Sequence, residues 1–205
     1  MLHASPFTSI ARQWKTLLLW GILCALFASA LSLLFPLEYR ADAGVYIISK
    51  SRYGVDPYTV VKSAEQVGQN IVQVIKTQDF FDKVMADIDP VFDKSQFQNV
   101  TDRVRTKHWQ KAVDGSVVFG TGVLSVSAYN TDPNQAKILA GALVDTLVQK
   151  GYEYIGGDVT IKQVNKPIVT RFPVRPNLPI NAAIGFVIGM ILSGIFITSK
   201  SKRIF

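Results

Sequence analysis

Five aspartates between positions 79 and 93 are the side chains best placed to support catalysis. They are Asp79, Asp82, Asp87, Asp89 and Asp93. Two carboxyl groups held close together can act as general acid and base, as they do in glycoside hydrolysis. Their spacing, however, puts them near the ends of predicted helices, where carboxylates cap backbone N–H groups or remain solvated. We therefore interpret them as capping and surface residues, and we expect no enzymatic activity.

Other reactive groups are few in this chain of 205 residues. The two histidines, His3 and His108, form no recognisable metal-ligand spacing. The sequence has neither a nucleophile elbow nor a glycine-rich phosphate loop. Cys24 is the single cysteine, which excludes an intrachain disulfide and favours a buried apolar thiol. We predict no catalytic site, no metal and no cofactor.

Two long uncharged runs dominate the hydropathy of the chain. The first covers residues 16–37 and the second residues 176–199, and each exceeds the roughly 20 residues that cross a bilayer. We place membrane helices at 16–37 and 180–199. Ala28-Ser29-Ala30 resembles a signal-peptide cleavage site, but apolar residues continue to Leu37, so we favour an uncleaved anchor.

Charge is concentrated at the two ends of the chain. The net charge is +7, and the tails at 1–15 and 200–205 have basic residues but no acidic ones. These bases are Arg12, Lys15, Lys200, Lys202 and Arg203. Short basic tails beside membrane helices stay in the cytoplasm, so we expect both termini inside and the middle of the chain outside the cytoplasmic membrane. This distribution argues for a membrane partner and against nucleic acid.

The middle of the chain predicts an α+β domain over residues 38–166. Its order is strand, helices, hairpin, helix, strand, and we expect the first and last strands to pair. The predicted elements are a strand at 39–49, a helix from Pro57 with Asp56 as its cap, a helix after Asp79, a short helix between Lys94 and Val104, a hairpin of 113–119 with 123–129, a helix from Pro133 to Lys150 capped by Asp132, and a strand at 158–165.

Prolines fill the segment 167–179, between the last predicted strand and the second membrane helix. They are Pro167, Pro173, Pro176 and Pro179. Each fixes φ and pushes the preceding residue toward extended backbone, which predicts a semi-rigid strut of polyproline character. A simple linker, in which prolines end the strand and begin the helix, would have much the same sequence.

Small residues recur every four positions in the second membrane helix. Gly185, Gly189 and Ser193 therefore share one helix face, where a neighbouring backbone can approach closely. This pattern predicts helix–helix packing, although glycine is also common in membrane helices in general. In the domain, a basic set could contact anionic glycans or lipid head groups, with a solvated face as the simpler interpretation. The set is Arg40, Arg52, Arg103, Arg105 and Lys107.

Three stretches together resemble the Wzz-type chain-length determinant family of bacterial polysaccharide co-polymerases. They are "YRADAGVYI" after the first anchor, "LSVSAYNTDPNQAKILAGAL", and "RFPVRPNLPINAAIGFVIGM" at the entry to the second membrane helix. The resemblance implies a homo-oligomeric ring in the inner membrane that regulates the chain length or export of a surface polysaccharide such as O-antigen, capsule or exopolysaccharide. It also implies a polysaccharide polymerase and a lipid-linked glycan as partners.

The sequence departs from longer family members because it lacks their very long helical hairpin. It is therefore more similar to the short capsule or exopolysaccharide type without a fused tyrosine kinase. This departure leaves a second interpretation, a membrane adaptor that activates a separate cytoplasmic tyrosine kinase through the amino-terminal tail or through the carboxyl-terminal residues, where Lys200, Lys202 and Arg203 could contact the kinase or lipid. A third is a structural component of another envelope assembly.

Overall fold

A computed structural model describes residues 13–49, 56–155 and 159–202. It divides the chain into two compact units. One unit is built from both ends of the chain, up to Leu37 and from Arg175, and the other runs from Glu38 to Val174. We call the first the helix pair and the second the domain.

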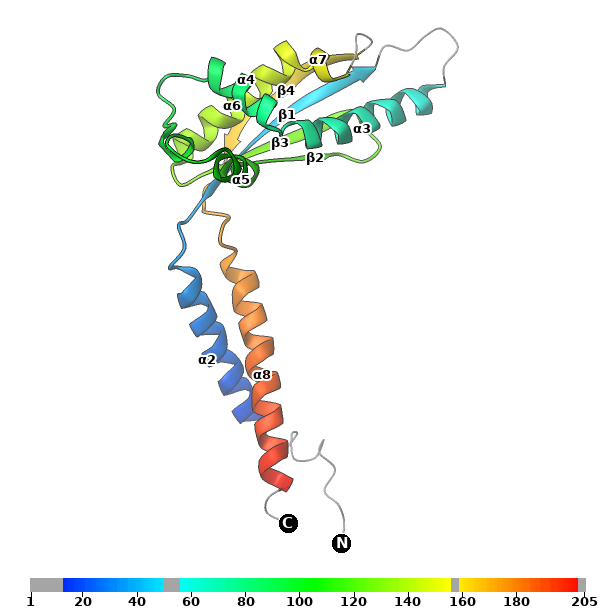
Figure 1. Cartoon of the computed structure of the whole chain (residues 1–205). Helices are drawn as coiled ribbons and strands as arrows, with labels where there is room; N and C mark the ends of the chain where they lie inside the picture. Colours follow the sequence, from blue (N-terminus) through cyan, green and yellow to red (C-terminus); the bar gives the residue numbers. More distant parts are fainter. Residues whose placement is uncertain (1–12, 50–55, 156–158, 203–205) are drawn as a thin grey trace. The chain divides into compact units, whose positions relative to one another are not determined.

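The described part of the domain contains a four-stranded antiparallel sheet and five α-helices (Figure 1). In chain order its elements are β1 (Tyr39–Ser49), α3 (Pro57–Val74), α4 (Gln78–Asp87), the 3₁₀ turn η1 (Ser95–Phe97), α5 (Asp102–Ala112), β2 (Val113–Val117), β3 (Val123–Asn130), α6 (Pro133–Lys150), α7 (Tyr152–Ile155) and β4 (Val159–Val169). The predicted α+β class is confirmed.

The sheet has the strand order β2-β3-β1-β4, with every neighbouring pair antiparallel. The first and last strands therefore pair, as the sequence predicted, and Ala41 lies opposite Val169. β3 completes the other side of β1, with Ala41 opposite Ala128. Both chain ends of the domain thus leave from adjacent strands.

Alternating side chains on the central strands build the core on one face of the sheet. Ala41, Val45 and Ile47 of β1 are buried, as are Leu124 and Val126 of β3. Helices α6 and α3 pack on this face, α6 across β1, β3 and β4 and α3 across β1 and β2. The second face is polar in its centre, where the Ser127 hydroxyl donates to Asp42 at 2.6 Å. Period-two burial of this kind follows from the pleat of a strand.

Helix α6 forms as predicted because its cap and its apolar face agree. The carboxylate of Asp132 accepts a hydrogen bond from the Asn134 N–H at 2.8 Å, and Pro133 occupies the first turn. Its predicted face, which includes Leu139, Leu143 and Leu147, is buried. Asp56 differs, because it stands at the N-cap of α3 but its side chain makes no capping hydrogen bond.

The predicted helix between Lys94 and Val104 is wrong in its extent. The 3₁₀ turn Ser95–Phe97 forms in the first part of this range, and the helix α5 begins only at Asp102 and continues to Ala112. The cause is packing, because the Trp109 side chain is fully buried against Phe81 and Phe97. Its indole N–H donates to the Ile75 carbonyl at 2.8 Å, so tertiary contacts override a weakly periodic sequence.

The helix pair consists of α2 (Trp14–Ser32) and α8 (Leu178–Lys202). Residues Trp14–Ser32 and Leu178–Ser199 are long and apolar enough to cross a membrane. α2 ends five residues before the predicted boundary at Leu37. Pro36 disfavours helical backbone at Phe35, which explains an end upstream of it.

Candidate functional site: the helix pair and the ends of β1 and β4

Glycines of α8 lie directly against the backbone of α2. A Cβ atom added at Gly185 would stand 2.7 Å from the Cys24 carbonyl oxygen and 2.7 Å from the Ala28 Cβ. A Cβ at Gly189 would stand 2.6 Å from the Trp20 carbonyl oxygen. Real Cβ atoms do not approach other atoms so closely, so only glycine fits at these two positions. The small-residue face therefore contacts α2 of the same chain.

Polar groups also join the two helices. The Asn181 amide donates to the Ser32 hydroxyl at 2.6 Å, and Ser32 is buried. Ser193, the third residue of the predicted face, is buried as well. Hydrogen bonds between membrane helices contribute about 0.6–2 kcal/mol each. Asn181 and Ser32 thus fix the register of the pair at one end, while the glycines allow close approach further along.

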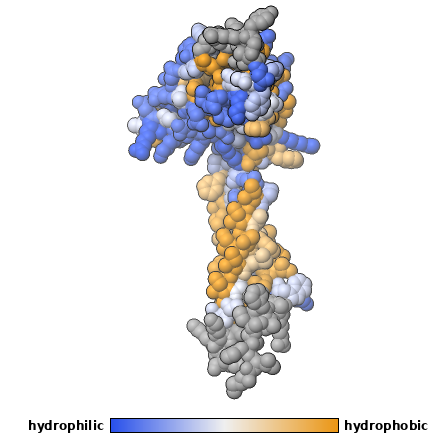
Figure 2. Space-filling view, turned by 90° about the vertical axis from the view of Figure 1, so that its right-hand side faces the viewer, coloured by the Kyte–Doolittle hydropathy of each residue, from blue (hydrophilic) through white to orange (hydrophobic). Residues whose placement is uncertain are grey.

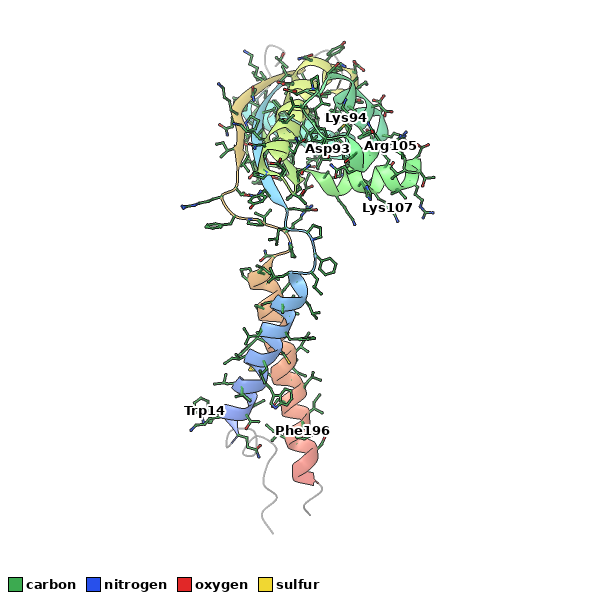
Figure 3. All side chains as sticks on the ribbon, turned by 90° about the vertical axis from the view of Figure 1, so that its left-hand side faces the viewer. Trp14, Asp93, Lys94, Arg105, Lys107 and Phe196 are labelled. Carbon is green, nitrogen blue, oxygen red and sulfur yellow. The ribbon has the colours of Figure 1, made fainter. Side chains whose placement is uncertain are left out.

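The face of the helix pair that Figure 2 shows is mostly apolar. Its large side chains, such as Leu26, Phe27 and Ile191, are more than half exposed. Figure 3 shows Trp14 at the beginning of α2 and Phe196 toward the end of α8, and both side chains are more than half exposed. Aromatic side chains gather at the boundary between lipid and water in membrane proteins. This surface suits lipid better than water.

The first two prolines of the predicted strut lie in or beside the domain's sheet. Pro167 is part of β4, an edge strand, at a register shift between the pairs Asp42–Ile168 and Gly44–Asn165. A proline is tolerated there because an irregular edge position needs no N–H donor. The strand thus extends four residues beyond the predicted end at Asn165, and the segment begins as sheet.

Beyond β4 the chain stays hydrogen bonded to the beginning of β1. The Thr170 N–H donates to the Arg40 carbonyl at 2.8 Å, and the Val174 N–H donates to the Glu38 carbonyl at 2.8 Å. Neither donor is a proline, so the missing N–H of Pro173 removes no hydrogen bond from this pairing. The segment up to Val174 is therefore held by β1 as well as stiffened by proline.

The other two prolines belong to the helix pair. Pro176 follows a cis peptide bond from Arg175, and Pro179 lies in the first turn of α8. A proline is accommodated in a first turn because the N–H groups there have no helical acceptor. Helix α8 includes Lys200 and Lys202, whose side chains lie outside the described part of the chain, as does Arg203 entirely.

The five aspartates do not assemble into a carboxylate site. Asp87 pairs with Lys150 at 2.5 Å, whereas Asp89 and Asp93 accept the backbone N–H groups of Val91 and Ser95. Asp79 belongs to a separate network described below, and Asp82 has no hydrogen-bond partner among the described residues. In that part of the chain no group of three His, Cys, Asp or Glu side chains could hold a metal ion.

A polar network joins α4 to α7. The Lys83 ammonium donates to Asp79 at 2.9 Å, to Glu153 at 2.7 Å and to the Tyr154 hydroxyl at 2.9 Å, and Tyr154 in turn donates to Asp79. Hydrogen bonds from Tyr154 and Lys83 lower the pKa of Asp79, and Glu153, Tyr154 and Asp79 raise the pKa of Lys83. Burial and the Asp79 carboxylate raise the pKa of Tyr154.

We expect the Asp79 contact to stabilise the domain at neutral pH and to fail in acid. The folded-state pKa of Asp79 lies below its ordinary value of 3.8, so the folded protein binds fewer protons than the unfolded chain. The stabilisation is complete above about pH 5 and is lost as pH falls through the folded pKa. The difference in urea midpoint between the intact chain and Asp79→Asn should therefore shrink as the pH is lowered from 6 to 3. The matched control is Asp82→Asn, and a midpoint difference for Asp79→Asn that stays constant with pH would contradict the assignment.

No protein-family model and no curated protein sequence matches the chain.

Sequence reasoning missed three features of the structure. The Ser32–Asn181 bond has no local signal, because a single serine and a single asparagine at the ends of apolar runs are common. Gly21 of α2 was also missed, although a Cβ there would stand 2.7 Å from the Phe186 ring. The network of Lys83 could have been found in part, since Asp79 and Lys83 are spaced for an i,i+4 pair.

Proposed function

We propose that the protein is a polysaccharide co-polymerase of the cytoplasmic membrane that regulates the chain length or export of a bacterial surface polysaccharide. The observation that carries this proposal is the pairing of β1 with β4, which brings both chain ends of one α+β domain to the same sheet end. Each end then leads to a helix apolar enough to cross a membrane. This is the layout of the co-polymerase family that the sequence resembles.

The proposed topology places both termini in the cytoplasm and the domain on the outer face. Its support is the bias of Lys and Arg in the tails, 1–15 and 200–205. A domain on the outer face would meet a growing glycan and the polymerase that extends it on a lipid carrier.

The proposed working form is a homo-oligomeric ring. The hydrogen bonds of Thr170 and Val174 to β1 support a stiff exit from the domain, which would let the orientation of one copy constrain its neighbours. Because Gly185 and Gly189 are occupied by α2 of the same chain, contacts between copies would use the remaining surfaces.

Deleting the gene in its host tests the proposal. Surface polysaccharide extracted from the deletion strain should change from a clustered length distribution to a broad or shorter one on a size-resolving gel, and the intact gene should restore it. An unchanged distribution would overturn the proposal. A loss in amount without a change in length, accompanied by loss of tyrosine phosphorylation in a cytoplasmic kinase, would instead favour the adaptor function.

A further inference from the structure

We propose that the exposed basic face of α5 binds the anionic phospholipid head groups of the membrane that α2 and α8 cross. This inference rests on the membrane placement within the proposed function, and is independent of any role in polysaccharide synthesis.

The basic residues of α5 share one face of the helix. Arg103, Lys107 and Lys111 are spaced four apart and exposed, whereas Trp109 and Ala112 on another face are buried. Figure 3 shows Lys107 at the surface of the domain. The face is thus held outward by the anchoring of Trp109 in the core.

Charge on α5 is unusual for this domain. From Glu38 to Val174 the sequence has 16 basic and 15 acidic residues, yet α5 alone has four bases and one acid. The single acid, Asp102, pairs with Arg105, whose guanidinium lies over the Phe81 ring. The net positive charge of α5 is therefore concentrated on the outward face.

Two charges of this face, those of Arg103 and Lys107, are not neutralised within the described part of the domain. Arg103 and Lys107 have no hydrogen-bond or ion-pair partner among the described residues. Like charges at i and i+4 destabilise a helix slightly, and here no acid stands between them. An external layer of negative charge would remove this repulsion.

Within the domain, the C-terminal end of α5 lies at the sheet end where β1 begins. Ala112 is followed directly by Val113, which lies opposite Ala128. Ala128 is in turn opposite Ala41, only two residues after the beginning of β1. Residues 33–38 alone separate β1 from α2, and a fully extended chain covers about 3.5 Å per residue. The same sheet end also has Arg40 and Arg171, whereas Arg52 of the predicted basic set lies outside the described residues.

Anionic lipid fits this face better than a sugar chain does. Glycan sites commonly use exposed aromatic rings, and the ring of α5 itself, Trp109, is fully buried. Membrane-proximal Lys and Arg side chains each contribute about a fivefold gain in attraction to an anionic bilayer, an effect that salt screens. The connection of residues 33–38 is short enough for two such charges to reach an anionic bilayer.

Amine labelling of the full chain in lipid nanodiscs tests this inference. One set of discs contains phosphatidylcholine alone and the other contains about one third phosphatidylglycerol. We expect Lys107 to react with a soluble amine reagent at least about fivefold more slowly in the anionic discs. Lys62 on α3, also exposed, should react equally in both. Raising the salt to 0.5 M should restore Lys107 reactivity.

Variants separate this contact from other causes. Arg103→Glu should restore the reactivity of Lys107 in anionic discs, whereas the matched charge change Lys137→Glu on α6 should not. The inference would be overturned if Lys107 reacted rapidly in both kinds of disc. It would also be overturned if Lys107 reacted slowly in both, because that result indicates a contact with protein and not with anionic lipid. A chain that fails to co-elute with discs would overturn the membrane placement itself, while normal incorporation without lipid-dependent labelling overturns only the inference.

Discussion

Replacing Gly185 and Gly189 with leucine is expected to separate α2 from α8. At both positions the new Cβ would overlap backbone carbonyl oxygens of α2, at 2.7 Å from Cys24 and 2.6 Å from Trp20. Backbone atoms cannot rotate away as a side chain can, so the helices must move apart. Overpacking costs about 1–3 kcal/mol per site, which corresponds to roughly a tenfold or greater loss of the paired state.

Cross-linking across the Ser32–Asn181 contact measures this pairing. In a Cys24→Ala background, cysteines at positions 32 and 181 should be joined within one chain by a short bis-thiol cross-linker, because the native Asn181 amide nitrogen and Ser32 hydroxyl are 2.6 Å apart. We expect the Gly185→Leu/Gly189→Leu chain to lose most of this product. Gly194→Leu is the matched control, because its Cβ would meet only the Leu17 side chain at 3.9 Å. Undiminished cross-linking in the double variant would refute the close packing.

The glycine contacts change how an oligomer of this chain would be understood. The four-residue spacing predicted a close approach, but spacing alone cannot say which helix approaches. In the structure the partner is α2, because the two helices are antiparallel neighbours with Ser32 beside Asn181 and Trp20 beside Gly189. A glycine variant that abolished a ring would therefore act first by separating the helices of one chain.

Elements with a strong local pattern were predictable from sequence. In α6 the cap, the proline and the apolar spacing all indicate the same helix, and β1 ends in the apolar run from Val45 to Ile48. In α5 such signals are absent, because its buried residues are only Trp109 and Ala112 and their neighbours are mostly charged or polar. Its position depends on the contacts of Trp109 with Phe81 and Phe97, which lie outside the helix and cannot be read from its own periodicity.

The sequence predicts that the prolines stiffen the backbone, but it does not predict that one of them lies in the sheet. Pro167 enters β4 only because β4 is an edge strand with a register shift there, and strand order is a property of the whole sheet. The hydrogen bonds of Thr170 and Val174 to β1 likewise depend on how β1 and β4 pair. The prolines alone predict a rigid segment, whereas its alignment with β1 depends on the tertiary pairing of the two strands.

Replacing Trp109 with alanine is expected to produce the largest loss of stability in the domain. The side chain is fully buried, and its ring centre lies 5.1 Å from that of Phe81 and 6.1 Å from that of Phe97. Its N–H also satisfies the Ile75 carbonyl at the end of α3. Removing a buried tryptophan costs about 3–5 kcal/mol through lost burial and the cavity that remains. Urea unfolding followed by far-ultraviolet circular dichroism should show this loss, while Gln110→Ala, an exposed neighbour, should unfold nearly as the intact chain does.

Trp109→Phe separates the contribution of aromatic packing from that of the indole hydrogen bond. Phenylalanine keeps part of the aromatic packing but leaves the Ile75 carbonyl without this donor, which costs about 1–3 kcal/mol, so the variant should fall between the intact chain and Trp109→Ala. Because Trp109 is the main buried contact of α5, its loss should also free the basic face from its fixed outward position. We therefore expect Trp109→Ala to abolish the lipid-dependent protection of Lys107 and Gln110→Ala to retain it. Equal stability of Trp109→Ala and Gln110→Ala would mean that α5 is not anchored through this residue.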